Sequence, residues 1–416
     1  MLAALALCAG AGPTAASPAE LFGFGGRSPG MAQTGVATAT DFDAAYLNPA
    51  GLADVGRKRI TFGFLFGDFD LEMDGRQTDT EHATALLFGG AIPVPLGGAL
   101  RDRIGFGIGF LVPPSAINRA RHPFPGEPVF ALLETRAHVV GLQLALGMRL
   151  TPRWRAGIGV TTLATLDGGI HVSTDAAGRF TTRSEQNLIT RLNPLAGVRL
   201  LVPEKHLQLG ATFRAPARTD YQILITNNLE ETLPLTVPTI AIGGTSQYDP
   251  MVVAVEAAWE RKRRLMVLLQ LAWQRWSAYP LPTVNPVENN PPQQEPGFHD
   301  TFSPRLGVQQ MLWHGARSAA VVRGGYQFMP SPAPEMTGRQ SLLDNTRHVL
   351  SAGAGVYLPG MTVPLYLDGW VQLHILTGRS HEKDPAAFEP DEELPFDRIE
   401  TGGRIVVGGM TMGVDI

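Results

Sequence analysis

Twelve residues, VVGLQLALGMRL (Val139–Leu150), carry the pattern that decides the fold. From Val140 onward every second residue is large and apolar, and the positions between hold glycine, glutamine, alanine and arginine. A period of two places the two sets on opposite faces of a β-strand. In a soluble sandwich the apolar face would point into a core, whereas in a membrane barrel it would point to lipid. The stretch therefore predicts a two-faced strand and leaves both architectures open.

The same alternation recurs along the chain, for example in His206–Arg214 and Ser303–Met311. The expected strands are 59–69, 82–92, 103–112, 137–150, 153–166, 187–202, 206–214, 250–260, 264–276, 302–313, 317–328, 347–358, 363–376 and 402–415. The expected long connections are 70–81, 113–136, 167–186, 215–249, 277–301, 329–346 and 377–401, and short ones alternate with them. Short periplasmic turns opposite long extracellular loops distinguish outer-membrane barrels. The sequence therefore predicts an all-β fold, a 14-stranded antiparallel transmembrane β-barrel, with the strand-like stretch 236–248 assigned to a loop.

The composition agrees with a barrel and excludes several other classes. Charged residues make up 17% of the 416 residues, while glycine (47) and proline (33) are abundant. No run of about 18 apolar residues occurs, which excludes a bundle of transmembrane helices. The net charge of −4 gives no electrostatic case for binding nucleic acid. Because the chain has one cysteine, Cys8, and no GxSxG, HExxH or Walker motif, we expect no enzyme activity, no cofactor and no metal.

The N-terminal region divides into two segments of different character. Residues 1–17 contain the apolar stretch LAALALCAGAG followed by small residues, which is typical of a secretory signal peptide; a short buried helix is the alternative. Residues 18–58 are too rich in glycine and alanine to form a core of their own, and they include a turn signal at Asn48-Pro49. We therefore expect a signal peptide (1–17), a segment suited to filling a lumen (18–58) and a barrel (59–416).

The stretch GRSPGMAQTGVATATDFDAAYLNPAGLA (Gly26–Ala53) closely resembles the N-terminal hatch of FadL-type outer-membrane transporters of long-chain fatty acids and other hydrophobic compounds. Weaker similarities follow in family order at Arg103–Pro113, Leu207–Pro216, Leu271–Tyr279, Phe302–Gln310 and Leu342–Leu358. The resemblance implies a hatch motif at Asn48, Pro49 and Ala50 inside a 14-stranded barrel of a Gram-negative outer membrane. It also implies passive uptake: capture by apolar extracellular loops, passage to a pocket, movement of the hatch, and lateral exit into the membrane.

Two long loops contain apolar clusters in stretches that we expect to be exposed. Exposed apolar clusters usually mark binding surfaces. The candidate residues of an outer ligand-capture groove are Phe124, Phe130, Leu132 and Leu133 in loop 113–136, and Tyr221, Ile223, Leu224 and Ile225 in loop 215–249. The alternative is that these loops pack against each other.

Glycines and arginines supply two further sets of candidates within the strands. Gly105, Gly107 and Gly109 weaken one strand at a spacing of two, which makes it a candidate for a gap in the wall. A fatty-acid carboxylate would favour an arginine in the lumen, and the candidates are Arg149, Arg199, Arg214, Arg305 and Arg323. The favoured alternative is that these cations solvate the lumen or pair with acids of the hatch such as Asp41 and Asp43.

The first functional hypothesis is therefore the uptake of long-chain fatty acids. The alternatives are import of aromatic or aliphatic hydrocarbons through the same fold, and a docking or assembly role without transport. The expected partners are a hydrophobic small molecule, outer-membrane lipid and lipopolysaccharide, and we expect the protein to be a monomer.

Overall fold

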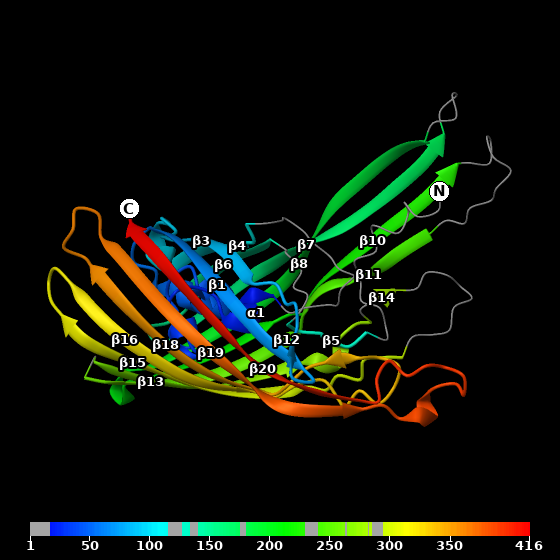
Figure 1. The fold of residues 1–416 in the computed structure, drawn as a ribbon. Coiled ribbons are helices and arrows are strands. Elements are labelled where there is room, and N and C mark those ends of the chain that lie inside the picture. Colours follow the sequence, from blue (N-terminus) through cyan, green and yellow to red (C-terminus); the bar gives the residue numbers. More distant parts are fainter. Residues whose placement is uncertain are drawn as a thin grey trace.

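The wall of the molecule is a single closed β-sheet (Figure 1). The computed structural model describes residues 17–114, 127–133, 140–174, 180–228, 240–262, 264–281, 283–284 and 294–416. The fourteen wall strands are β1 (Arg59–Met73), β3 (Ala83–Pro93), β4 (Ile104–Val112), β6 (Gly141–Arg149), β7 (Trp154–Thr174), β8 (Phe180–Val202), β9 (Leu207–Arg214), β12 (Met251–Arg261), β13 (Leu265–Arg275), β15 (Thr301–His314), β16 (Ala319–Met329), β18 (Arg347–Leu358), β19 (Leu365–Glu382) and β20 (Arg398–Asp415). The elements outside the wall and the lumen are β2 (Arg76–Gln77), β5 (Val129–Phe130), β10 (Ala217–Asn228), β11 (Ile240–Asp249), β14 (Thr283–Val284), β17 (Leu342–Leu343), η3 (Gly98–Leu100), η4 (Pro203–Lys205), η5 (Trp276–Ala278) and η6 (Pro385–Ala387).

Each wall strand pairs antiparallel with the next, and the last strand pairs with the first. The β1–β20 ladder runs from Arg59↔Asp415 to Met73↔Thr401 and closes the barrel. Closure gives every wall strand a partner on both sides within the barrel, which is the condition for a β-structure in lipid. The predicted 14-stranded antiparallel barrel is therefore confirmed.

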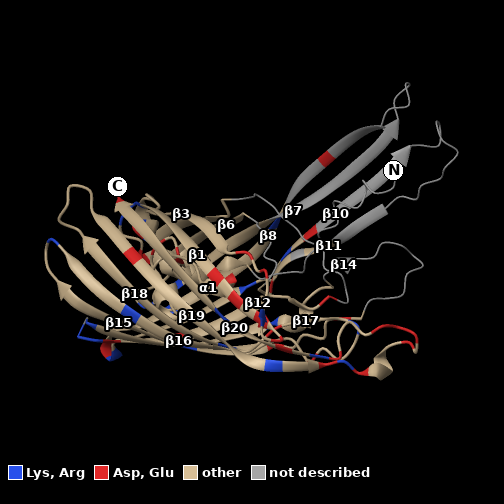
Figure 2. Ribbon diagram, viewed as in Figure 1, with Lys and Arg blue, Asp and Glu red and all other residues tan. Residues whose placement is uncertain are grey.

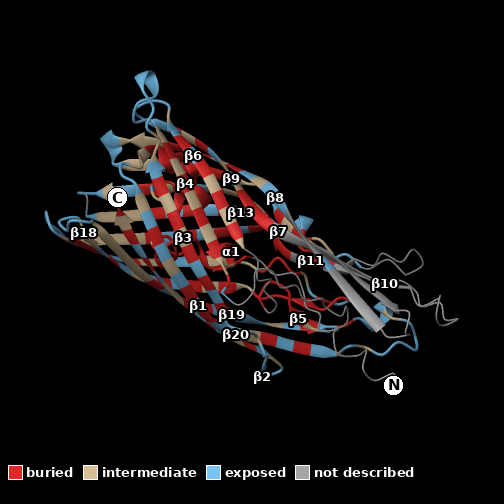
Figure 3. Ribbon diagram, turned by 90° about the horizontal axis from the view of Figure 1, so that it is seen from above, coloured by how far each residue is buried: buried red, intermediate tan, exposed pale blue. Residues whose placement is uncertain are grey.

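The apolar face of the strands points outward. In β6, Gly141 and Gly147 are buried, whereas Leu146 and Met148 are exposed at 46% and 37%. Figure 3 shows the same alternation of buried and exposed residues along neighbouring strands. Figure 2 shows that most of each wall strand is uncharged, with scattered Lys, Arg, Asp and Glu residues along it. The stretch that opened the sequence analysis thus belongs to a lipid-facing wall and not to a sandwich core. Separately, no helix among the described residues is long and apolar enough to cross a membrane.

Two predicted loops were wrong because they contain long strands. Residues 167–186 largely continue β7 and β8, which pair as far as Thr174↔Phe180. Residues 215–249 contain the β10–β11 hairpin, and β10 also runs parallel to β7 from Tyr221↔Leu166 onward. This pairing is open to β10 because β6 ends its ladder with β7 at Leu163, which leaves that edge of β7 free. The strands project beyond the barrel in Figure 1, at the end with the long connections.

Residues 17–58, which we call the lumen segment, lie inside the barrel. They form α1 (Pro18–Phe22), η1 (Pro29–Met31), α2 (Ala44–Leu47) and η2 (Pro49–Asp54) and are almost wholly buried. The side chain of Ser17 caps α1 and that of Asn48 caps η2, and in both cases proline occupies the first helical position. Small residues allow these short helices to lie against the wall, because glycine and alanine bring backbone close to backbone.

Candidate functional site: the contact between the lumen segment and the wall

Asn48 joins the lumen segment to the wall from a fully buried position. Its Oδ1 accepts a hydrogen bond from the backbone nitrogen of Ala50 at 3.0 Å. Its Nδ2 donates to the carbonyl oxygen of Val36 at 2.7 Å, within the lumen segment. The same Nδ2 reaches the wall carbonyls of Val198 at 3.1 Å and Ala211 at 3.4 Å. One amide therefore fixes a turn, links two parts of the segment and attaches both to the barrel.

Wall glycines make room for the predicted hatch motif. A Cβ added to Gly197 would lie 2.0 Å from Oδ1 of Asn48. Added at Gly157 or Gly147, it would lie 2.3 Å from the carbonyl carbon or oxygen of Pro49. Distances below about 3 Å between such atoms do not occur without movement of the backbone, so these wall positions require glycine for the observed packing.

The three glycines of the candidate wall gap also face the lumen segment. A Cβ on Gly105 would lie 1.9 Å from the carbonyl oxygen of Leu52, and one on Gly107 would lie 2.6 Å from Cδ2 of the same residue. One on Gly109 would lie 2.6 Å from Cζ of Phe24. In this structure β4 pairs on both sides, with β3 and with β6, so the wall is closed along it. Its opening during transport remains a prediction.

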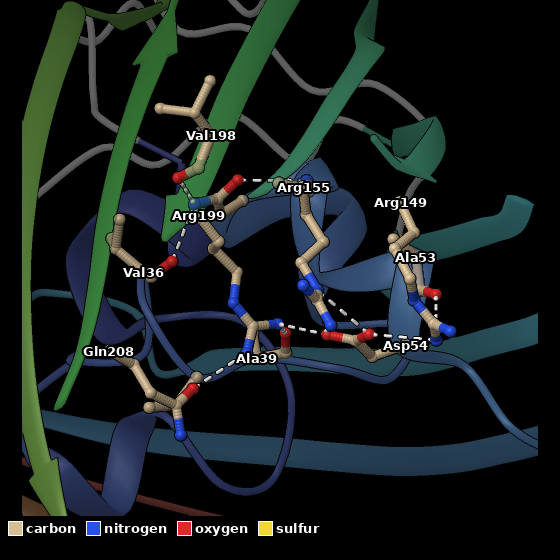
Figure 4. A network of polar contacts seen from close by, with 12 residues as sticks. Val36, Ala39, Ala53, Asp54, Arg149, Arg155, Val198, Arg199 and Gln208 are labelled. Atoms are coloured by element: carbon tan, nitrogen blue, oxygen red, sulfur yellow. Dashed lines mark hydrogen bonds and ion pairs between the residues drawn. The ribbon is translucent and has the colours of Figure 1, made fainter. Parts of the chain in front are cut away.

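The carboxylate of Asp54, in the lumen segment, lies close to three arginines of the wall (Figure 4). Asp54 lies 3.3 Å from the guanidinium of Arg149, 3.1 Å from that of Arg155 and 3.7 Å from that of Arg199. Arg199 is buried and also donates to the carbonyl oxygen of Ala39 at 3.1 Å. Two of the five predicted lumen arginines therefore bind the lumen segment.

A second buried ion pair lies near the start of the lumen segment. Glu20 is 4% exposed and contacts the guanidinium of Arg214 directly. The same carboxylate accepts hydrogen bonds from Gln274 at 2.7 Å and from the hydroxyl of Tyr46 at 3.2 Å. The guanidinium of Arg214 also lies 4.3 Å from the centre of the Tyr46 ring. Within the lumen segment, Glu20 and Asp54, and not the expected Asp41 and Asp43, are thus the acids that pair with predicted arginines.

A wall carboxylate holds the middle of the lumen segment. Glu256 of β12 accepts hydrogen bonds from three consecutive backbone nitrogens, Gly35 at 2.6 Å, Val36 at 3.1 Å and Ala37 at 2.9 Å. Successive N–H groups that converge on one anion form a strong, charge-assisted contact. Glu256 was not among the residues predicted from the sequence, although one signal was available: it is the only charged residue in the apolar strand stretch 252–259.

The remaining two predicted arginines are also engaged. Arg305 donates to the carbonyl oxygen of Gln33 at 3.3 Å. Arg323 lies 2.6 Å from the carboxylate of Asp368 and also contacts the hydroxyl of Tyr357, both on the wall. All five candidate lumen cations therefore face inward and already have partners in this structure.

The residues predicted to capture ligand fall into three groups: buried loop residues, strand residues and one residue outside the described range. Phe130, Leu132 and Leu133 were expected to be exposed, and this is wrong: they are at most 1% exposed, and the backbone of β5 pairs with that of β17. Loops closing over the barrel bury them, which sequence spacing does not reveal. Tyr221, Ile223, Leu224 and Ile225 lie on the backbone of β10 rather than in a loop. Phe124 lies outside the described residues. A role of these residues in capturing ligand remains a prediction.

A polar cavity of about 390 Å³ lies between the lumen segment and the wall. It is near the end of the barrel with the short turns, and its lining includes Arg27, Asp41, Asp43, Arg59, Tyr366 and Asp368. Asp41 pairs with Arg59 at 2.7 Å. Burial, followed by the neighbouring Asp41, raises the pKa of Asp43 to about 6. Charged side chains of the lumen segment and of the wall therefore share this cavity.

On the other side of the segment the structure places a buried polar cluster that the sequence did not indicate. Nε and Nη1 of Arg347, both carboxylate oxygens of Asp344 and Nδ1 of His374 have no hydrogen-bond partner among the described residues. Nε2 of His374 lies 3.0 Å from Oε1 of Gln372, whose amide nitrogen donates to the carbonyl oxygen of Phe22 at 3.0 Å. The cluster thus connects to the lumen segment. No group of three metal-ligating side chains occurs in the part of the chain that the structure describes.

A closed 14-stranded barrel with an apolar outer wall and a segment packed in its lumen defines a class, the outer-membrane transport barrels that carry an internal plug. The family described as "Outer membrane protein transport protein (OMPP1/FadL/TodX)" matches residues 7–363. The chain therefore belongs to this family of outer-membrane transporters for hydrophobic compounds, which is not an enzyme family. The resemblance stated from the sequence is confirmed.

Solved structures share the fold at low sequence identity. A Pseudomonas aeruginosa FadL homologue is 14% identical with a TM-score of 0.58, and the match covers 98% of each chain. The P. putida toluene transporter TodX is 10% identical with a TM-score of 0.55, covering 95% of this chain and 99% of that one. The Ralstonia pickettii toluene transporter TbuX is 13% identical with a TM-score of 0.50, covering 94% and 98%. A search of curated proteins found no match.

Proposed function

We propose that the protein imports long-chain fatty acids through a barrel gated by movement of the lumen segment, which acts as a hatch. The contact that supports this proposal is the set of anchors at Asn48, Asp54, Glu20 and Glu256. These anchors are hydrogen bonds and ion pairs, which can break and re-form, and they hold a segment that fills the lumen. The hydrophobic solute then leaves sideways into the membrane, so transport follows its gradient.

Arg347 is the residue that supports a fatty acid as the solute. Its guanidinium is 3% exposed and has two N–H groups without a partner among the described residues. Guanidinium is the preferred partner of a carboxylate. The neighbouring Asp344 lies in the loop before β18; burial raises the pKa of its carboxyl, and the nearby Arg347 lowers it in part.

A second candidate function is import of aromatic or aliphatic hydrocarbons. The observation that favours it is that all five arginines first expected to bind a head group are already engaged with acids or carbonyl oxygens. Two structurally similar proteins are named as toluene transporters. A hydrocarbon has no charged group that needs a cation, so its passage through the lumen would not depend on a contact with Arg347.

A reversible cross-link tests whether the hatch must move. A Cβ on Gly107 would lie 3.4 Å from Cβ of Ala45, close to the range of about 3.5–4.5 Å found in disulfides. It would also displace the side chain of Leu52, an effect that the single Gly107→Cys variant measures separately. We expect Ala45→Cys with Gly107→Cys, in a Cys8→Ser background, to abolish uptake of labelled oleate when oxidised and to restore it after reduction. The two single-cysteine variants are the controls. Undiminished uptake by the fully cross-linked protein would refute the gating proposal.

The choice between the two solutes requires a pair of probes. In a transporter-deficient host, Arg347→Gln should lower uptake of labelled oleate at least tenfold and leave uptake of labelled toluene unchanged. Arg398→Gln, at an exposed arginine that pairs with Glu400, is the matched control. Equal oleate uptake by Arg347→Gln and the wild type would remove the fatty-acid assignment. An assembled barrel that takes up neither probe would favour the docking role.

A further inference from the structure

Ser17 begins the lumen segment at a fixed and buried position. Its backbone nitrogen donates to Oδ1 of Asp249 at 2.7 Å, and Ser17 and Asp249 are 8% and 6% exposed. Its Oγ accepts the backbone N–H of Glu20 at 3.1 Å and so caps α1, and Pro18 occupies the first helical position. Ser17 therefore supplies the cap from which the first helix of the lumen segment starts.

The residues before Ser17 have the pattern of a processing site. Thr14-Ala15-Ala16 places small residues one and three positions before the Ala16–Ser17 bond, which is what signal peptidase requires after an apolar stretch. Cleavage one residue later, at the boundary expected from the sequence, would leave Pro18 first and would remove the cap of α1. The cap of α1 therefore favours a boundary one residue before the one expected from the sequence.

Asp249 forms no ion pair with a lysine or arginine among the described residues. Arg214 is near enough to lower the pKa of Asp249 somewhat, but its guanidinium contacts Glu20 directly. Asp249 ends β11, outside the membrane-spanning strands, and burial together with the nearby Glu20 raises its pKa to about 6. A buried carboxylate beside a second acid is costly unless a positive charge faces it.

We propose that the Ala16–Ser17 bond is the signal-peptidase site and that the new α-ammonium group of Ser17 forms a buried ion pair with Asp249. Hydrolysis breaks the peptide C–N bond; water supplies one of the two oxygens of the Ala16 carboxylate, and its two protons convert the amide N–H of Ser17 into the α-ammonium group. An α-amino group has an ordinary pKa of about 7.7–8.0, and a carboxylate at hydrogen-bond distance favours its charged form. In the precursor, Asp249 accepts a hydrogen bond only from a neutral amide. Cleavage would therefore strengthen the contact between Ser17 and Asp249 that holds the lumen segment in place. This inference does not depend on which compound is transported.

The first test is direct. Mass spectrometry of the protein purified from outer membranes should find Ser17 as the N-terminal residue. A mature chain that begins at any other residue would overturn the proposed site.

The second test measures the ion pair by hydrogen exchange of the α1 amides in detergent. Asp249→Asn should speed this exchange about tenfold in the mature protein. An asparagine inserted between Ala16 and Ser17 leaves cleavage after Ala16 but moves the ammonium by about 3.8 Å, and we expect a similar acceleration. Adding Asp249→Asn to the inserted chain should then change exchange less than twofold. The control is Glu204→Gln, at an exposed acid that pairs with Arg153 in a turn far from α1.

Each outcome of this cycle decides the proposal. If Asp249→Asn accelerates exchange tenfold even in the inserted chain, its effect comes from the loss of another contact and the ion pair is wrong. If neither variant differs from the wild type, the N-terminus has no role as an anchor. Only acceleration in each single variant, without further acceleration in the combination, supports the ion pair.

Discussion

Replacing Asn48 with alanine should loosen the lumen segment without unfolding the barrel. The substitution removes the bond from Ala50 to Oδ1 and the bond from Nδ2 to the buried carbonyl of Val36, along with two contacts to the wall. Loss of a helix cap costs about 1 kcal/mol. A buried carbonyl left without a donor costs about 1–3 kcal/mol. The total of about 2–4 kcal/mol corresponds to a roughly 30- to 1,000-fold rise in the opening equilibrium of the segment.

The assay is hydrogen exchange, resolved by peptide, in detergent micelles. Amides of the lumen segment, including those of Gly35 and Ala37 that donate to Glu256, should exchange at least 30-fold faster in Asn48→Ala. Amides of the wall ladders should not change, because every one of their backbone bonds remains. The matched control is Asn193→Ala, which removes an amide bond to the carbonyl of Thr161 within the wall and no contact with the segment.

Two results would refute this reasoning. A rise of less than threefold in the lumen segment would mean that Asn48 does not hold it. An equal rise in the segment and in the wall would mean that the whole barrel is destabilised, so that the buried amide belongs to the fold rather than to a removable plug.

Three further predictions follow from the same contacts. Gly197→Ala places a Cβ 2.0 Å from Oδ1 of Asn48, so it should strongly accelerate hydrogen exchange of the lumen segment. The acceleration should be much smaller in an Asn48→Ala background, which lacks this oxygen. Equal acceleration in both backgrounds would contradict the steric argument. Glu256→Gln loses the anion that binds three N–H groups and should cost about 1–3 kcal/mol of segment stability, seen as roughly tenfold or faster exchange; unchanged protection would count against the contact. Burial raises the pKa of Asp43 in the folded protein from 3.8 to about 6. Ionised Asp43 therefore lowers the free energy of unfolding: the effect is absent below pH 3.8, increases up to about pH 6 and is complete above that pH. Asp43→Asn should therefore raise the melting temperature at pH 7.5 and not at pH 4, and a rise of the same size at both values would refute the assignment.

The wall was predictable from the sequence because its signal is local. Alternating residues in Val139–Leu150 face opposite sides of a strand whatever the rest of the chain does, and the sorting of loops by length favoured the barrel. The same reasoning failed for β10 and for the outer parts of β7 and β8. Beyond the membrane neither face of a strand meets lipid, so the alternation that marks a wall strand is no longer required there.

The candidate site was only partly predictable. The motif at Asn48 and the inward arginines could be read from the sequence, since one is a turn signal and the others interrupt apolar strands. The burial of Phe130 could not, because it depends on loops from opposite parts of the chain closing over the barrel. Which apolar stretch is exposed depends on what covers it, and that information is not local.

By itself the sequence determined the class of wall, its closed antiparallel order and the presence of a small-residue segment before it. Only the tertiary structure decided which charges meet. Glu20 and Arg214 are separated by 194 positions, and Glu256 and Gly35 by 221. Such pairs form because the barrel closes around the segment and brings strands from the whole chain to one axis. The physical reason is that strand alternation is a property of neighbouring residues, whereas the pairing of buried charges is a property of the closed lumen.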